Sequence, residues 1–418
     1  MKILVTILLP VVILLMLESC ARTIVTLRSD VAVRVEAVLP ETVASAELGW
    51  DRLPNFAGRL RHDFTSAERR YDAHGFQAYD TAQIADKDTP RIVTIGDSNT
   101  YGWGVRPEDA FAEVLDRALP NASVINLGML GYSSFQGYRT LLKYGEQLQP
   151  AAIVASFNRN DRKYVLNGNI DSEQKFSHYA EGQQKASRYE WLNRIYMVRL
   201  LRSVMRRIGL VQPEPLLNTH INSLVARVPP ERYRENLRKI AEYGRSRKIP
   251  VIFLLLKDNP LYSAQLRAGI AFRQDGQYEK AVRAFSIALS HRGYDRLARK
   301  YLVQTYQSMG QHAKAAALEH IDAEPDNMDG AYPIYLDTDY NEIMVEVARE
   351  FGIKLVDARP MLDAMPEVFI DINHPDEVGH ARIAEMLLKA LEEVAPALAK
   401  GALKPIGDRM ADHVRLKS

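Results

Sequence analysis

The chain has 418 residues, of which 47% are apolar, and its formal net charge is +2. This is enough apolar material for one large domain and an accessory one. The small net charge gives no indication of nucleic-acid binding. The single cysteine excludes a fold held together by internal disulfides, so stability must come from the core.

Residues 1–25 are predicted to be an export signal or a membrane anchor. Lys2 precedes an almost unbroken apolar run, residues 3–17, which fits a signal-peptide core and is short for a spanning helix. Three alternatives stay open: an uncleaved anchor extended by residues 23–25, a bacterial lipoprotein carrying lipid on Cys20, and simple cleavage. All three export the domain. We expect a bacterial-type, membrane-anchored protein in the periplasm or another extracytoplasmic space.

Residues 37–90 are predicted to be a lead-in segment of irregular structure with short strands. Its apolar positions include Trp50 and Phe76, which are expected to pack on the main sheet. No catalytic role is assigned to this segment.

Short apolar segments then alternate with amphipathic stretches. The expected strands are residues 92–95, 124–125, 153–155, 251–256 and 354–356. The expected helices are residues 111–119, 136–148, 232–247, 340–351 and 377–391. This alternation predicts an α/β fold, a three-layer α/β/α sandwich of the flavodoxin-like kind with a five-stranded parallel sheet.

Residues 258–325 interrupt this alternation with a helical segment that repeats at an offset of 34 residues. Gly276-Gln277 recurs as Gly310-Gln311, and Lys280-Ala281 recurs as Lys314-Ala315. The offset is the tetratricopeptide period, although only one and a half to two copies are present. Two interpretations stay open: a module that binds a protein partner, and a helical hairpin that packs on the main domain.

Two polar blocks supply the groups that acyl transfer needs. Gly96-Asp97-Ser98-Asn99 follows an expected strand and places the Ser98 hydroxyl at the carboxyl edge of the sheet, where open α/β sheets bind ligands. In Asp371-Ile372-Asn373-His374-Pro375, a tight turn can bring the carboxylate to the far ring nitrogen of the histidine. A nucleophile, a base and an orienting group therefore predict an esterase.

Motifs for metal-dependent or nucleotide chemistry are absent from the sequence. There is no His-Glu-x-x-His or Cys-x-x-Cys arrangement. The glycines around Trp103 lack the Lys-Ser/Thr that completes a phosphate-binding loop. We expect no metal and no cofactor.

From about Arg91 to Val394 the sequence resembles the SGNH, or GDSL-type, hydrolases, which are named for a serine, glycine, asparagine and histidine in separate blocks. The first block is Gly96-Asp97-Ser98, and in the second Asn126 is followed five residues later by Gly131. The third block reads Asn158-Arg159-Asn160-Asp161, with Asn158 in place of the usual glycine, a change that we interpret as altered pocket shape. The last block is Asp371 to Pro375, and Gly379-His380 also fits the pattern.

The resemblance implies that His374 takes the proton of Ser98 as the hydroxyl attacks an ester carbonyl, while Asp371 orients the imidazole. The N–H groups of Ser98 and Gly131 and the amide of Asn160 would hold the oxyanion.

The expected substrate is an acyl or acetyl ester, on a small molecule or on a cell-envelope carbohydrate or lipid. The hydrolase domain would comprise residues 91–257 and 326–396, followed by a tail at 397–418. Two alternatives are an O-acyltransferase with the same triad and a partner-binding scaffold with a non-catalytic hydrolase domain. Contact with the membrane is expected through the N-terminus.

Overall fold

The computed structural model describes residues 16–22, 41–59, 67–77, 89–166, 170–188, 195, 197–198, 201, 205, 224–290, 296–319 and 340–403. Most of the predicted anchor and most of the predicted tail lie outside these residues. Residues 16–22 are helical. Among the residues that the structure describes, no helix has the length and apolar character needed to cross a membrane.

A five-stranded parallel sheet forms the centre of the molecule, with strand order β11-β10-β7-β5-β6. Its strands are β5 (Arg91–Gly96), β6 (Ser123–Asn126), β7 (Ala152–Ser156), β10 (Val251–Leu255) and β11 (Lys354–Asp357). Every residue of the first four is buried. Burial on both faces is why these strands read as continuous apolar runs in the sequence.

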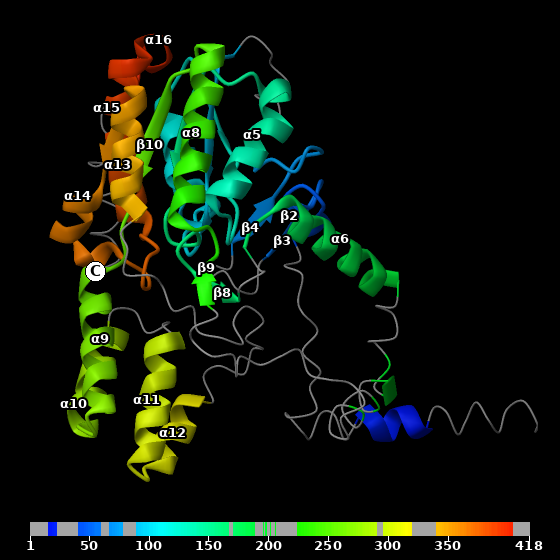
Figure 1. Cartoon of the computed structure of the whole chain (residues 1–418), viewed down its shortest axis with the longest axis vertical. Helices are drawn as coiled ribbons and strands as arrows, with labels where there is room; N and C mark the ends of the chain where they lie inside the picture. Colours follow the sequence, from blue (N-terminus) through cyan, green and yellow to red (C-terminus); the bar gives the residue numbers. More distant parts are fainter. Residues whose placement is uncertain are drawn as a thin grey trace, which may run out of the picture.

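Helices cover both faces of the sheet and complete three layers. One face carries α5 (Ser134–Leu148), α8 (Pro230–Arg247) and α13 (Tyr340–Phe351), which stand side by side in Figure 1. The other carries α4 (Phe111–Ala118), α14 (Arg359–Ala364), α15 (Glu377–Val394) and α16 (Pro396–Ala399). The predicted fold is therefore confirmed.

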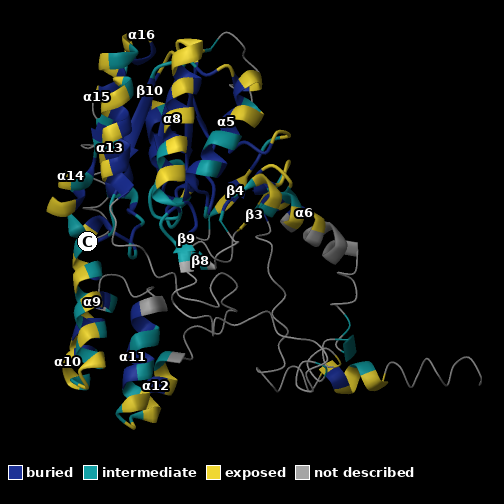
Figure 2. Ribbon diagram, viewed as in Figure 1, coloured by how far each residue is buried: buried dark blue, intermediate teal, exposed yellow. Residues whose placement is uncertain are grey.

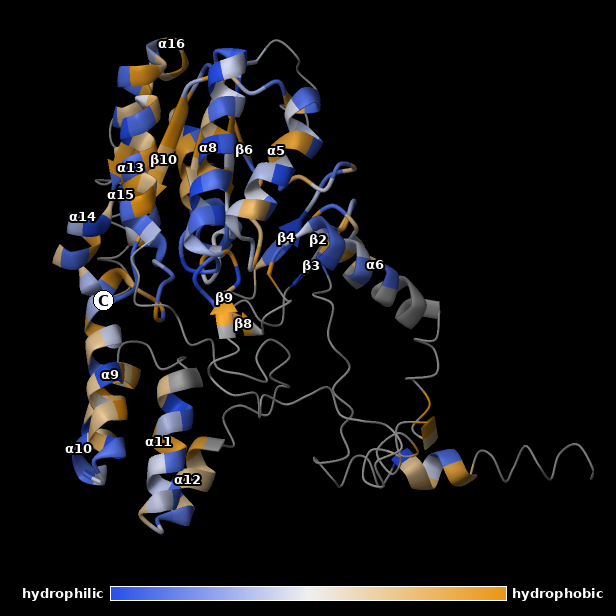
Figure 3. Cartoon of the chain, in the orientation of Figure 1, coloured by the Kyte–Doolittle hydropathy of each residue, from blue (hydrophilic) through white to orange (hydrophobic). Residues whose placement is uncertain are grey.

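Alternate residues of each strand supply the two apolar cores. Val93 and Ile153 pack with α5, α8 and α13, whereas Ile92 and Val154 pack with α4 and α15. This is the period of two that a strand imposes on its side chains. Figure 2 shows the buried sheet between helices whose outer faces are exposed, and Figure 3 shows the apolar strands that produce it.

Small antiparallel strand pairs lie outside the central sheet. The lead-in segment forms β1 (Thr42–Ser45) with β2 (Gly49–Arg52), and β3 (Ala57–Arg59) with β4 (Glu68–Arg70). A third pair joins β8 (Tyr164–Leu166) to β9 (Leu224–Ala226), and α6 (Glu173–Arg188) contacts β1 and β2. Short helical turns are α3 (Ser98–Tyr101), η2 (Pro107–Asp109) and η6 (Pro366–Val368).

Between β10 and α13 the chain forms four further helices. They are α9 (Pro260–Gln274), α10 (Tyr278–Ser290), α11 (Arg296–Ser308) and α12 (His312–Glu319). Gly276 and Gly310 have φ of 73° and 70°. Lys280 and Lys314 each lie 5.5 Å from the ring centroid of the aromatic residue eight positions earlier, Phe272 and Tyr306. The two halves thus make matching contacts, while the tetratricopeptide assignment and the predicted domain boundaries stay predictions.

Candidate active site

The nucleophile candidate lies where β5 ends and α3 begins. Asp97 caps α3 by accepting a hydrogen bond from the Asn99 N–H at 2.9 Å, which places Ser98 at the first helical position. A Cβ at Gly96 would lie 1.9 Å from Thr100 Oγ1 and 2.8 Å from the Ser156 carbonyl oxygen, so this tight turn needs glycine. The turn places Ser98 at the carboxyl edge of the sheet.

The structure brings the three predicted triad side chains together. His374 Nε2 lies 2.7 Å from Ser98 Oγ, and His374 Nδ1 lies 2.7 Å from Asp371 Oδ2. Asp371 Oδ1 also accepts the backbone N–H groups of Asn373 and His374, both at 2.9 Å. The short turn therefore fixes the carboxylate and the imidazole at once.

The protonation states of Asp371 and His374 follow from their hydrogen bonds. Burial raises the pKa of Asp371, but the charge of His374 and the hydrogen bonds from His374 and Asn373 outweigh it and hold that pKa below its usual value. An ionised Asp371 only accepts hydrogen bonds. In its neutral form, His374 therefore carries its proton on Nδ1, and Nε2 is left to accept the Ser98 hydroxyl proton.

Gly131, the predicted backbone donor, has its orientation fixed by the lead-in segment. The Trp50 indole Nε1 donates to the Leu130 carbonyl oxygen at 3.1 Å, and Gly131 has φ of 73°. In a trans peptide the C=O and the following N–H point in opposite directions. The Gly131 N–H therefore points away from the Trp50 indole. None of the described residues accepts a hydrogen bond from this N–H. On the other side of Gly131, Arg227 Nη1 donates to the Gly131 carbonyl oxygen at 2.6 Å.

Asn160, the predicted side-chain donor, is coupled to the nucleophile turn. Its Nδ2 donates to Asp97 Oδ2 at 3.3 Å. Burial raises the pKa of Asp97, opposed by hydrogen bonds from Asn99 and by the charges of His374 and Arg159. The next residue, Asp161, accepts the backbone N–H of Ser134 at 2.8 Å, and this bond ties the Asn160 loop to α5.

The side chain of Asn126, in the second block, forms hydrogen bonds with backbone groups of two loops. Its Oδ1 accepts the Gly128 N–H at 2.9 Å, and its Nδ2 donates to the Thr100 carbonyl oxygen at 2.9 Å and to the Glu113 carboxyl at 3.1 Å. Burial raises the pKa of Glu113 to about 8. Asn126 thus joins the Gly131 loop to the turn that follows Ser98.

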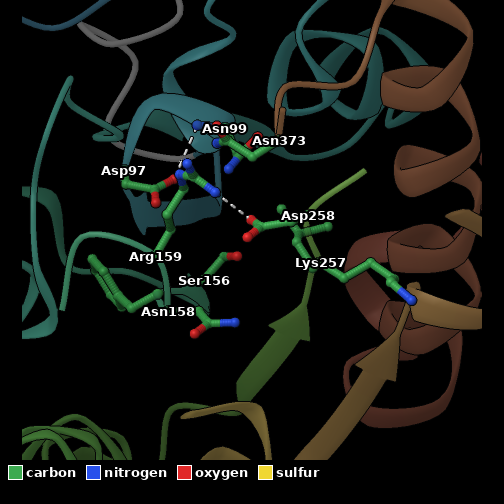
Figure 4. A pocket seen from close by; sticks show the side chains of 10 residues that line it. Asp97, Asn99, Ser156, Asn158, Arg159, Lys257, Asp258 and Asn373 are labelled. Atoms are coloured by element: carbon green, nitrogen blue, oxygen red, sulfur yellow. Dashed lines mark hydrogen bonds and ion pairs between the residues drawn. The ribbon is translucent and has the colours of Figure 1, made fainter. Parts of the chain in front are cut away.

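Asn158, which stands in place of the usual glycine, lines a small polar cavity next to the nucleophile turn. The cavity has a volume of about 20 Å³, and Figure 4 shows Asp97, Asn99, Arg159 and Asp258 around it. Asn158 is not among the residues with positive φ. The backbone therefore does not need glycine here, and the Asn158 side chain forms part of the cavity lining.

The remaining predicted residues lie apart from this hydrogen-bond network. His380 is 1% exposed, accepts the Phe111 N–H on Nδ1 at 3.2 Å, and has its pKa lowered to about 3 by burial. It is a neutral core residue on α15. Cys20 is exposed within the helical residues 16–22. No three His, Cys, Asp or Glu side chains within the described part of the chain are grouped to hold a metal ion.

Sequence reasoning missed the supporting residues from the lead-in segment. Arg52 donates to the Gly128 carbonyl oxygen, and Arg69, fully buried, donates to the carbonyl oxygens of Gly102 at 2.7 Å and Val105 at 3.2 Å. Together with Trp50, these side chains hold the two loops that follow β5 and β6. In the sequence, the one sign of this role was the pair of arginines, Arg52 and Arg69, in a segment expected to form short strands.

Comparison with known proteins finds a family model that matches part of this site. The family model described as "GDSL-like Lipase/Acylhydrolase family" matches residues 94–296, which contain Ser98, Gly131 and Asn160. Asp371 and His374 lie beyond the matched segment and are brought to it by the fold. No curated protein matches the chain.

Several solved structures are similar in part. An α/β hydrolase, LAE5, from the metagenome of Lake Arreo, Spain, is 14% identical, with 73% of this chain and 97% of that chain covered and a TM-score of 0.35. The lipase/acylhydrolase from Enterococcus faecalis is 14% identical, with 73% and 96% covered and a TM-score of 0.35. A putative lipolytic protein of the G-D-S-L family from Desulfitobacterium hafniense is 13% identical, with 72% and 99% covered and a TM-score of 0.34.

The family match and the three-layer fold around the Ser98 turn both bear on the enzyme class of this protein. Residues 94–296 of this protein thus match the GDSL-like lipase/acylhydrolase family over just under half of the chain, and this match indicates a hydrolase.

Proposed function

We propose that this protein is a serine esterase in which Ser98 is the nucleophile, His374 the general base and Asp371 the group that orients the base. The observation that carries the proposal is the continuous chain of hydrogen bonds from Ser98 Oγ through His374 to Asp371, with both distances 2.7 Å. Such a chain activates a hydroxyl that is otherwise a weak nucleophile.

In the acylation half, Ser98 Oγ forms a bond to the ester carbonyl carbon while His374 Nε2 takes the hydroxyl proton. The carbonyl oxygen becomes an oxyanion, for which the Ser98 N–H, the Gly131 N–H and the Asn160 amide are the proposed donors. His374 then gives its proton to the departing alcohol oxygen as the ester bond breaks. Asp371 stabilises the imidazolium throughout without taking its proton.

In the second half, the acyl group on Ser98 is transferred to water. His374 Nε2 takes a proton from the water as its oxygen attacks, and returns that proton to Ser98 Oγ as the acid leaves. If a sugar hydroxyl takes the place of water, the same residues perform O-acyl transfer.

For the substrate we propose a short acyl group, such as acetyl, on an alcohol of the cell envelope. The acyl group is proposed by analogy with the resembled family alone. The small polar cavity next to the nucleophile turn does not bear on it, because Asp97 and Asn99 line that cavity and Ser98 and His374 do not. The envelope location rests on the apolar run at residues 3–17.

The test is turnover of p-nitrophenyl acetate, butyrate and octanoate by the full chain in mild detergent, beside Ser98→Ala. We expect the highest kcat/KM with acetate and no turnover by the variant. Octanoate as the best substrate would contradict the short-acyl proposal. Adding acetylatable sugars separates the two reactions: a hydrolase releases acetate, whereas a transferase forms acetyl sugar. A wild-type chain without turnover of any ester would favour the partner-binding scaffold.

We also propose export and membrane tethering through the N-terminus. Intact-mass analysis of the protein made in a bacterial host distinguishes the three forms, because an uncleaved chain, a lipidated chain beginning at Cys20 and a cleaved unlipidated chain differ in mass. An uncleaved chain recovered from the cytosol would overturn the proposal.

A further inference from the structure

The segment between β10 and α9 contacts the Asn160 loop through one carboxylate. Asp258 Oδ1 lies 2.7 Å from Arg159 Nη1, and Asp258 Oδ2 lies 2.6 Å from Arg162 Nη2. The two arginines flank Asn160 and Asp161 in the chain. Their side chains are only 12% and 15% exposed. Figure 4 shows the Arg159 side chain pointing toward Asp258, with a dashed line joining the two side chains at the cavity.

The charges of this cluster favour an ionised carboxylate. Burial raises the pKa of Asp258, but the charges of Arg159 and Arg162 and their hydrogen bonds outweigh it and lower that pKa. Asp258 thus bridges two arginines, one through each carboxylate oxygen, and partly buried charge-assisted contacts of this kind fix geometry better than exposed ion pairs do. Asp258 therefore holds both ends of the loop that carries Asn160.

The next residue contacts the other half of the site. The Asn259 N–H donates to the Ile372 carbonyl oxygen at 2.7 Å, and Asn259 Nδ2 lies 3.5 Å from the Asp371 carbonyl oxygen. Asn259 is 1% exposed, and its Oδ1 caps α9 by accepting two backbone N–H groups, those of Leu261 and Tyr262. One side chain therefore starts the helical insertion and contacts the turn that carries Asp371 and His374.

The insertion also packs directly on that turn. Ile372 lies between Asp371 and His374 in the chain, and its side chain packs against the apolar core of α9, α10 and α11. Tyr262 and Leu266 of α9 belong to this core and are 3% and 7% exposed. The helical insertion thus contacts both catalytic loops by way of its first helix and the two residues before it.

We propose that Asp258 and Asn259 are positioning residues for ester hydrolysis, joining the oxyanion loop to the acid–base turn through the root of the helical insertion. The inference rests on the proposed role of Ser98, His374 and Asn160. It makes the insertion part of the catalytic framework, so its removal lowers turnover of even a small ester.

The kinetic test is Asp258→Asn in the full chain, measured with p-nitrophenyl acetate beside Asp363→Asn. Asp363 pairs with Lys257, the residue before Asp258, and is 50% exposed, so it is a matched carboxylate outside the site. We expect kcat of Asp258→Asn to fall about 10- to 100-fold with KM within about threefold, since misplacement of a donor by about 1 Å costs up to about 100-fold. The control should stay within about twofold. A kcat of Asp258→Asn within twofold of wild type would overturn the inference, as would a fall no larger than the loss of folded protein.

Hydrogen exchange tests the same connection without any turnover. In Asp258→Asn the amides of residues 156–164 should exchange faster, and in Asn259→Ala those of residues 369–376 should exchange faster, relative to wild type and Asp363→Asn. Unchanged exchange in both segments would refute the connection. If wild type hydrolyses no ester at all, the proposed function fails, and the exchange result alone decides whether the root of the insertion holds the two loops.

Discussion

Replacing Trp50 with phenylalanine tests how the oxyanion donor is oriented. The substitution keeps an aromatic ring in the cluster with Leu130 and Tyr132, but it removes the indole N–H that donates to the Leu130 carbonyl oxygen at 3.1 Å. The Leu130–Gly131 peptide then loses the bond that directs the Gly131 N–H. The active site keeps all of its own side chains.

The expected size follows from these contacts. Complete loss of one oxyanion donor costs about 100- to 1000-fold in turnover. Trp50→Phe leaves the donor in place with its direction unconstrained, so we expect a fall of about tenfold in kcat with KM little changed. Leu130 is 7% exposed, and leaving its carbonyl oxygen unpaired should lower the free energy of unfolding by about 1 to 3 kcal/mol.

The assay compares Trp50→Phe with Tyr132→Phe, using p-nitrophenyl acetate kinetics and thermal unfolding of each protein. Tyr132 donates its hydroxyl to the Trp50 carbonyl oxygen at 2.7 Å, so this control removes a hydrogen bond from the same cluster without touching the Leu130 carbonyl. Both variants should lose stability, but only Trp50→Phe should lose kcat. Equal kcat values for the two variants would refute the reasoning.

Three further substitutions give distinct results. Asp371→Asn should lower kcat about 10,000-fold with little change in fold, because the amide favours the wrong imidazole tautomer. Steady-state kinetics measures this fall. Activity near that of wild type would remove Asp371 from the triad. Asn160→Ala should lower kcat about 100- to 1000-fold; a change confined to KM in the same assay would instead make Asn160 a substrate-binding group. Glu113→Gln should gain stability relative to wild type between pH 6 and pH 8. The folded pKa of Glu113, about 8, lies above its unfolded value, so wild-type stability falls as pH rises through this window, by roughly 2 to 3 kcal/mol. Thermal unfolding at both pH values measures the difference, and identical pH dependence in the two proteins would contradict it.

The strands and the Asp371–His374 pair could be predicted because their signals are local, whereas Ser98, 276 residues before His374, was joined to that pair through the resemblance to the SGNH hydrolases. Four strands are buried on both faces, so their hydropathy marks them. The turn at Asp371 brings a carboxylate to a histidine three residues later, which is a matter of spacing alone. The predicted strand 124–125 was short at both ends, since Ser123 and Asn126 are polar and yet buried.

The supporting contacts could not be predicted, because they join residues far apart in the chain. Trp50 and Leu130 are separated by 80 residues, and Asn259 and Asp371 by 112. Nothing in the local sequence of Trp50 distinguishes a positioning side chain from one that merely packs. Likewise, the repeat in the insertion predicted helices, whereas the contact of Ile372 with their core depends on how the whole domain folds.

Labelling with a fluorophosphonate tests the central claim most directly, because such probes form a stable bond only to an activated serine. The full chain is incubated with the probe, digested and analysed by mass spectrometry, beside His374→Ala. We expect one modified serine, Ser98, and loss of the modification in His374→Ala. Modification of a different serine, or equal modification of Ser98 without the histidine, would contradict the account.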